Sequence, residues 1–265
     1  MNSTASAFPA AHVAPNPRHA LGGIWRLTSR RYLAPTQWGP LLLVLGLLAL
    51  LASAVIRDGS ARQYFSWISD FYLAFLVPVM AFLASGGTIR DDLKAGAADY
   101  LLTRPVRRPL YLAFKYLAHL ACFQAICLLG LGVMVGVAAF RHIPGIAPTL
   151  PWLLLGQVLT VTVFTALGFL CAVLTGRFLI VGLVYGAVVE VGVGNVPIQL
   201  NRIAVTHQVR TMLEPLLPYG PAHPAEQASP LATTGLLVLF ALVLLAVAAA
   251  RFSMQELAGA RPSDT

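Results

Sequence analysis

Apolar residues along this chain gather into six long runs that are separated by polar stretches. Crossing the hydrocarbon core of a bilayer takes roughly 20 residues of α-helix at about 1.5 Å per residue. The first and fifth runs are near the short limit, and the third is overlong. We therefore expect an all-α membrane protein with six transmembrane helices, at about residues 40–56, 71–89, 110–140, 151–175, 178–194 and 231–250.

The basic residues between these runs are unevenly divided. Of the 18 Lys and Arg residues, thirteen lie on one set of connections and five on the other. Because Lys and Arg collect in loops that stay in the cytoplasm, this asymmetry predicts that both termini are cytoplasmic. The five residues on the opposite, outer side are Arg57, Arg62, Arg141, Arg202 and Arg210.

The segment before the first span divides into two parts. Residues 1–17 are rich in Ala, Ser and Pro and lack the basic and apolar regions of a signal peptide, so we expect a disordered lead-in. Residues 19–33 set apolar positions against Arg26 and Arg30, which predicts an amphipathic helix in the cytoplasmic interface. An unstructured basic leader is the alternative there. We expect residues 18–265 to form a single transmembrane domain.

The outer segment between the fifth and sixth spans, residues 195–230, is too long for a tight turn. Its Val209, Met212 and Leu213 share one helical face until Pro215 stops the helix. We expect short interfacial or re-entrant helices in this segment.

The composition fits a membrane protein better than a large soluble domain. Hydrophobic residues make up 58% of the chain and charged residues 11%, whereas soluble domains average about 45–50% and about 25%. The net charge of +8 is explained by the basic cytoplasmic loops. We therefore expect the lipid bilayer, and no nucleic acid, as a partner.

One dense polar block, residues 90–115, interrupts the apolar pattern. It must face water, because nine of its residues are charged. Its residue types follow a definite order, at Asp92, Gly96, Asp99, Leu101, Leu102, Thr103, Arg104, Pro105, Val106 and Arg108. This order resembles the first cytoplasmic loop of type-2 ABC transporter permeases. The family often has Gly-Thr-Leu-Glu where this chain has Gly-Ala-Ala-Asp at residues 96–99, so the acid is kept and the hydroxyl is lost.

The resemblance implies a coupling loop, residues 90–108, that seats in a groove of a separate ATPase subunit. The carboxylates and Lys94 would supply charge pairs there, and the leucines apolar anchors. Pro105 and Pro109 would bracket a rigid turn leading into the third span. The alternative is a solvated basic loop. The expected coupling residues are Asp91, Asp92, Lys94, Gly96, Asp99, Leu101, Leu102, Thr103, Arg104, Pro105 and Arg108.

The resemblance further implies the membrane subunit of an ATP-driven transporter in the bacterial cytoplasmic membrane. Two copies, or one copy with a related permease, would pair with two ATPase subunits. The substrate is not identified by the sequence, and some relatives transmit force to an external partner instead. ATP and Mg²⁺ would bind the ATPase, so we expect no cofactor in this chain.

The sequence lacks the catalytic motifs that would indicate an enzyme. The sequence has no Walker A loop, no His-Glu-x-x-His and no Gly-x-Ser-x-Gly. Asp91, Asp92 and Asp99 resemble one acidic cluster of membrane prenyltransferases, but no second cluster completes such a site. A membrane-embedded lipid-modifying enzyme and an ATPase-independent carrier remain the alternative classes.

Four polar residues fall inside the predicted spans: His119, Gln124, Gln157 and Glu190. Polar groups at such depth are candidates for a substrate path. The structural alternative is a hydrogen bond between helices, and for Gln157 and Glu190 it would join the adjacent fourth and fifth spans. Replacing Glu190 with Gln separates the two, because the amide keeps a hydrogen bond and loses the charge.

Overall fold

The computed structural model describes residues 17–55, 60–93, 107–192, 204–213 and 229–254. Every regular element in these ranges is a helix, which confirms the all-α membrane architecture. The predicted lead-in lies almost wholly outside them. The elements are α1 (Pro17–Tyr32), α2 (Pro35–Val55), α3 (Ala61–Trp67), η2 (Ile68–Leu76), α4 (Val77–Asp92), α6 (Arg108–Phe140), α7 (Ile146–Leu174), α8 (Phe178–Tyr185), η3 (Gly186–Gly192), α9 (Val205–Leu213) and α10 (Pro230–Met254), where η marks π-helix.

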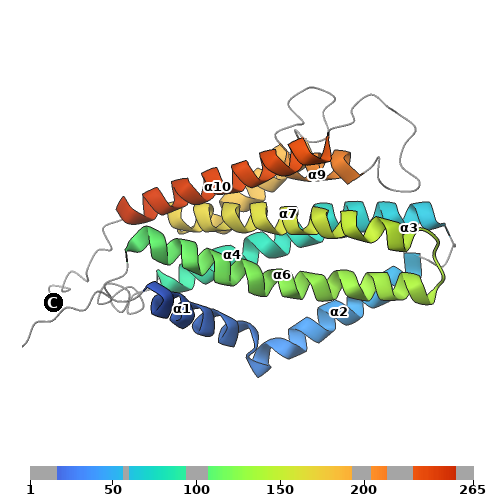
Figure 1. Ribbon diagram of the computed structural model, residues 1–265, viewed down its shortest axis with the longest axis horizontal. Coiled ribbons are helices and arrows are strands. Elements are labelled where there is room, and N and C mark those ends of the chain that lie inside the picture. Colours follow the sequence, from blue (N-terminus) through green and yellow to red (C-terminus); the bar gives the residue numbers. More distant parts are fainter. Residues whose placement is uncertain (1–16, 56–59, 94–106, 193–203, 214–228, 255–265) are drawn as a thin grey trace, which may run out of the picture.

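The central helix of the bundle is α7. Figure 1 shows α4, α6, α7 and α10 lying along the long axis of the molecule, with α1 and α2 forming a bent pair beside α6. In α7, 78% of the apolar stretch is buried, against 11% in α2. The outer helices leave many Leu, Val and Phe side chains exposed, as expected where lipid tails are as apolar as the core.

The second span begins at Ala61, earlier than the predicted residue 71. The elements α3, η2 and α4 form one helix, Ala61–Asp92, of 32 residues. Its start is fixed by Ser60, whose side-chain oxygen accepts a hydrogen bond from the backbone N–H of Gln63 at 3.3 Å. The prediction was wrong at this boundary because residues 61–70 are too polar to continue the apolar run, although they continue the helix.

A proline determines the π-helical stretch inside this span. The backbone N–H of Val77 bonds to the carbonyl of Tyr72, five residues earlier rather than four. Pro78 follows directly, and its ring would clash with the carbonyl four residues before it in a regular α-helix. The wider turn relieves this clash and lets the helix continue to Asp92.

The described part of the predicted fifth span, residues 178–192, is shorter than a full crossing. The 8 residues of α8 and the 7 of η3 together extend about 22 Å, less than a hydrocarbon core of roughly 30 Å. The described residues therefore contain 5 helices that are long and apolar enough to span a membrane, and the shorter apolar helix Phe178–Glu190.

The amphipathic helices predicted on either side of the membrane are both present. The first, α1, covers the predicted interfacial segment. The second, α9, lies in the outer segment and buries Val209, Met212 and Leu213, as predicted. Leu213 and Val209 close over Gly156 of α7, so α9 covers part of the central helix.

Small residues bring α4 and α7 into close contact. A Cβ atom on Gly168 of α7 would lie 2.0 Å from the Ser85 Oγ and 2.8 Å from the Phe82 carbonyl oxygen. The Ser85 side chain could rotate away, but the carbonyl belongs to the backbone of α4. The distance between the two helices therefore depends on the absence of a side chain at residue 168.

We predict that Gly168→Ala separates α4 from α7 and destabilises the bundle by about 1–3 kcal/mol, as overpacking does in other cores. The thermal unfolding midpoint of the purified chain in detergent measures the effect. Gly132→Ala is the matched control, because a Cβ at residue 132 meets nothing within 4 Å. Equal midpoints for the two variants would contradict the close-contact interpretation.

Candidate functional site

The polar block predicted to couple the protein to an ATPase connects the end of α4 to the start of α6. Helix α4 ends at Asp92, and α6 begins at Arg108 with Pro109 in its first turn, a position that suits proline because no N–H is needed there. The connecting residues 94–106 lie outside the described residues. The predicted coupling residues among them are Lys94, Gly96, Asp99, Leu101, Leu102, Thr103, Arg104 and Pro105.

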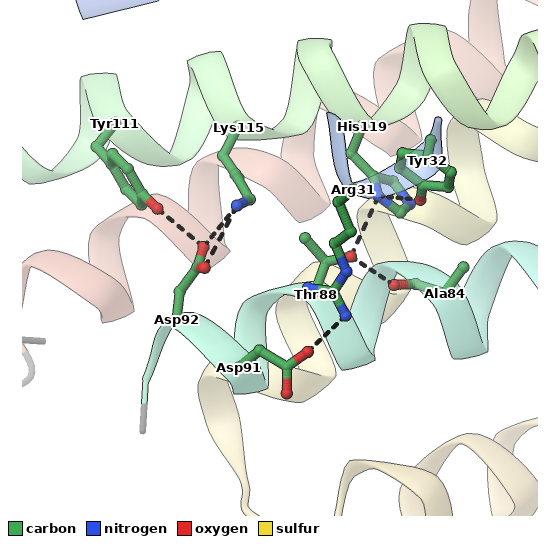
Figure 2. A network of polar contacts seen from close by, with 9 residues as sticks. All are labelled: Arg31, Tyr32, Ala84, Thr88, Asp91, Asp92, Tyr111, Lys115 and His119. Atoms are coloured by element: carbon green, nitrogen blue, oxygen red, sulfur yellow. Dashed lines mark hydrogen bonds and ion pairs between the residues drawn. The ribbon is translucent and has the colours of Figure 1, made fainter. Parts of the chain in front are cut away.

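A buried ion pair closes the base of this connection. The Asp92 carboxylate lies 3.0 Å from the Lys115 Nζ and accepts a hydrogen bond from the Tyr111 hydroxyl at 2.8 Å (Figure 2). The Lys115 side chain is only 4% exposed and that of Asp92 20%. Tyr111 and Lys115 are one helical turn apart, so both reach the same carboxylate from α6. We call these three residues the α4–α6 clamp.

The clamp places Lys115 and changes the expectation for Asp92. Lys115 lies in the first turns of the overlong third span, where a long basic side chain commonly extends its ammonium group to the interface. It is instead buried and neutralised by Asp92, because a charge in a low-dielectric environment needs a partner. Asp92 was expected to pair with the ATPase, and the structure places it in a pair within the chain.

The neighbouring carboxylate attaches the interfacial helix. Asp91 lies 2.5 Å from the Arg31 Nη2 on α1, and both side chains are partly exposed, at 40% and 45%. This pair is more exposed to solvent than the clamp, so it is expected to contribute less to stability. It connects the last turn of α1 to the last turn of α4.

The next residue of α1 makes a second attachment. The Tyr32 hydroxyl lies 2.7 Å from the Nδ1 of His119 on α6, and the Thr88 hydroxyl of α4 lies 3.4 Å from the same nitrogen (Figure 2). Burial raises the pKa of Tyr32 well above its usual value, so the phenol stays protonated in this contact. The tautomer of the imidazole sets whether the hydroxyl donates to Nδ1 or accepts from it. The imidazole also stacks on Phe123.

These contacts show which residues sequence reasoning missed. Arg31, Tyr32 and Thr88 had no predicted role at this site. A signal was present on α6, where Tyr111, Lys115 and His119 recur every four residues and so form one polar stripe on an apolar helix. The stripe predicts a polar neighbour, but the fold decides that α1 and α4 supply it.

Comparison with known protein families identifies the class of this chain. A family described as "ABC-2 family transporter protein" matches residues 28–257, which covers most of the sequence. The chain belongs to this family. A comparison with curated proteins gave no match. The prediction of a type-2 ABC transporter permease is thereby confirmed, and the chain is a multi-pass permease component of an ABC transporter.

Three of the permease's four predicted substrate-path residues, His119, Gln157 and Glu190, form contacts between helices. Buried His119 joins α6 to α1 and α4, as described above. The Oε1 of Gln157 lies 3.0 Å from the Tyr72 hydroxyl, which also lies 2.6 Å from the Cys127 carbonyl oxygen on α6. Gln157 therefore connects α7 to η2 in the second span, and not to the fifth span as the structural alternative proposed.

Glu190 holds the start of α9. Its carboxylate accepts hydrogen bonds from the backbone N–H groups of Val205 and Thr206, at 3.2 and 3.0 Å, and from the Thr206 hydroxyl at 2.5 Å. The Tyr185 hydroxyl adds a further bond at 2.9 Å. A carboxylate at a helix N-terminus satisfies donors that have no partner within the helix. These contacts favour the structural alternative for Glu190.

Gln124 differs from the other three residues. Buried nitrogens without a hydrogen-bond partner among the described residues occur in His119, Gln157 and Gln124, in each case Nε2. His119 and Gln157 make other side-chain contacts, whereas no side-chain contact is described for Gln124. An unsatisfied amide at this depth is costly, so Gln124 is the member of the set that the described contacts do not explain. The predicted substrate path stays a prediction for all four residues.

We predict that Asp92→Asn destabilises the permease by about 3–5 kcal/mol, because it leaves the Lys115 ammonium buried without a counter-charge. The double variant Asp92→Asn with Lys115→Met should recover much of this loss. Unfolding by SDS titration of the purified chain measures both. Asp91→Asn is the matched control and should cost at most about 1 kcal/mol, since its pair is wet. A double variant as unstable as Asp92→Asn alone would contradict the clamp.

We predict that Glu190→Gln weakens the attachment of α9 by about 1–2 kcal/mol, as loss of a helix cap does elsewhere. The amide has one acceptor oxygen and directs N–H groups at the remaining donors. The thermal midpoint in detergent should fall, and Asp70→Asn, at an exposed pair with Arg210, should leave it nearly unchanged. An unchanged midpoint combined with lost transport would assign Glu190 to the substrate path.

Proposed function

We propose that this permease couples ATP hydrolysis by a separate ATPase subunit to the export or translocation of a substrate across the bacterial cytoplasmic membrane. ATP and Mg²⁺ would bind the ATPase. A second copy of this chain, or a related permease, would complete the transporter with two ATPase subunits. Family membership supports the transport role, and the α4–α6 clamp is the observation that supports coupling through residues 90–108.

The clamp supports coupling because it joins both ends of the connecting segment. Asp92 precedes the segment and Tyr111 follows it, and their hydrogen bond fixes the two ends to each other. A force applied to residues 94–106 by a partner would therefore reach α4 and α6 together. From α4 it would pass to the central helix, because α4 contacts the α7 backbone closely at Gly168.

Coupling of this kind requires a stiff connection between the partner and the bundle. A buried ion pair with a hydrogen bond on the same carboxylate is a stiffer element than an exposed pair. ATP binding and hydrolysis would then shift the bundle between two conformations, since packed helices move between discrete arrangements rather than deforming continuously.

We predict that substitutions in residues 94–106 weaken binding of the ATPase without destabilising the permease, whereas substitutions in the clamp also destabilise it. Arg104→Glu and Asp99→Lys should reduce co-purification of the ATPase by at least about tenfold, the effect of about 1.4 kcal/mol at an interface. The experiment captures the tagged permease from its own host in mild detergent and measures bound ATPase and ATP turnover. Asp92 is unsuitable here, because its loss would unfold the base of the segment.

The matched control for this experiment is Arg141→Glu, a charge reversal at the opposite end of α6, which should keep the ATPase. All variants must show wild-type thermal midpoints to be compared. If Arg104→Glu and Asp99→Lys leave assembly and ATP turnover unchanged, the coupling role of residues 90–108 is wrong.

A further inference from the structure

The interfacial helix α1 has a face that the bundle does not use. Thr28 is buried and Tyr32, one turn later, bonds to His119, so these two residues mark the side of α1 that meets the bundle. At about 100° per residue, positions two before and two after Thr28 lie about 200° away, on the opposite side. These positions are Arg26 and Arg30, and both are exposed.

The two arginines have no ion-pair partner among the described residues of the chain. Exposed apolar side chains stand beside them, with Trp25 at 45% and Leu27 at 63% exposed. A helix with basic and large apolar residues exposed together suits neither a protein core nor bulk water. It suits the boundary between lipid tails and headgroups, where Trp and Arg are both favoured.

The junction between α1 and α2 independently indicates that α1 lies at the boundary between lipid tails and headgroups. The indole N–H of Trp38, in the first turn of α2, donates to the carbonyl oxygen of Leu33 at 3.3 Å. The Trp38 side chain is more than half exposed, and its position at the start of a membrane-spanning helix is typical of interfacial tryptophans. The bend that follows α1 therefore lies at the edge of the hydrocarbon core, within reach of lipid headgroups.

We propose that Arg26 and Arg30 form a binding site for the phosphate groups of anionic phospholipids in the cytoplasmic leaflet. The guanidinium group binds phosphate oxygens through paired N–H donors and keeps its charge at any physiological pH. Trp25 and Leu27 hold α1 at the depth where these phosphates lie. Because the site is made from residues of α1 alone, lipid binding does not depend on the proposed coupling to an ATPase.

The bound lipid acts on the end of α4 through Arg31. This residue follows Arg30 directly and pairs with Asp91, in the last turn of α4. A lipid that fixes the position of α1 therefore restrains the end of α4, just before the connection to α6. In terms of the proposed function, the charge of the membrane would tune how firmly the coupling segment is held.

The binding site can be tested on the purified full chain in lipid nanodiscs, with Trp25 as the single tryptophan after Trp38, Trp67 and Trp152 are changed to Phe. Quenching of Trp25 fluorescence by brominated phosphatidylglycerol is compared with quenching by brominated phosphatidylcholine. We expect the anionic lipid to be preferred by at least about fivefold, the effect of one arginine near an anionic surface. The variant Arg26→Gln with Arg30→Gln should lose this preference.

The matched control is Arg62→Gln with Arg141→Gln, which removes the same charge from exposed positions on the other side of the bundle and should keep the preference. Equal quenching by the two lipids in the single-tryptophan protein would overturn the site. A preference that survives in the Arg26→Gln, Arg30→Gln variant would overturn its assignment to these residues. Equal thermal midpoints for both variants exclude misfolding as the cause.

The effect on α4 has a separate readout in amide hydrogen exchange of residues 84–93. Exchange should be slower in phosphatidylglycerol than in phosphatidylcholine, and this difference should disappear in Arg31→Gln. Identical exchange in the two lipids would overturn the transmission from α1 to α4. Loss of ATPase binding in the docking experiment would have no bearing on either measurement, so the two proposals can fail independently.

Discussion

The end of the bundle that carries the candidate site is organised by the need to neutralise one buried charge. Lys115 lies within an apolar helix and is almost completely buried, where an unpaired ammonium group would be very costly. Asp92, in the last turn of α4, supplies the counter-charge. The pair fixes where α4 ends relative to the start of α6, and so fixes both ends of the segment between them. It also leaves the adjacent Asp91 on the side that meets α1.

Two kinds of contact then connect this end to the rest of the molecule. Polar contacts attach α1 to the bundle, through the ion pair of Arg31 with Asp91 and the hydrogen bond between Tyr32 and buried His119. Close packing brings α4 to α7, which meet at Gly168 without an intervening side chain. Both kinds of contact are expected between helices in lipid, where association depends on packing and on interhelical hydrogen bonds.

Residue types alone indicated the family and gave a poor account of the contacts that the described residues make at the candidate site. The order of residue types between 90 and 108 was sufficient to indicate the family, which the comparison with known families confirms. The roles of Asp91 and Asp92 were not recoverable in the same way. A carboxylate at the end of a helix can face a partner protein or its own bundle, and the residue type is the same in both cases. Glu190 illustrates this, because an acid in a span suggested a substrate path and the fold uses it to cap α9.

The sequence by itself determined the membrane class, the apolar helices, the amphipathic character of α1 and α9, and the family. These features depend on local periodicity and composition, which any bilayer imposes on a chain that crosses it. The tertiary structure alone decided the partners of Lys115, Gln157 and Glu190. Each of these depends on which helices become neighbours, and neighbouring helices here contact each other through residues that are distant in the chain, as Lys115 and Asp92 do.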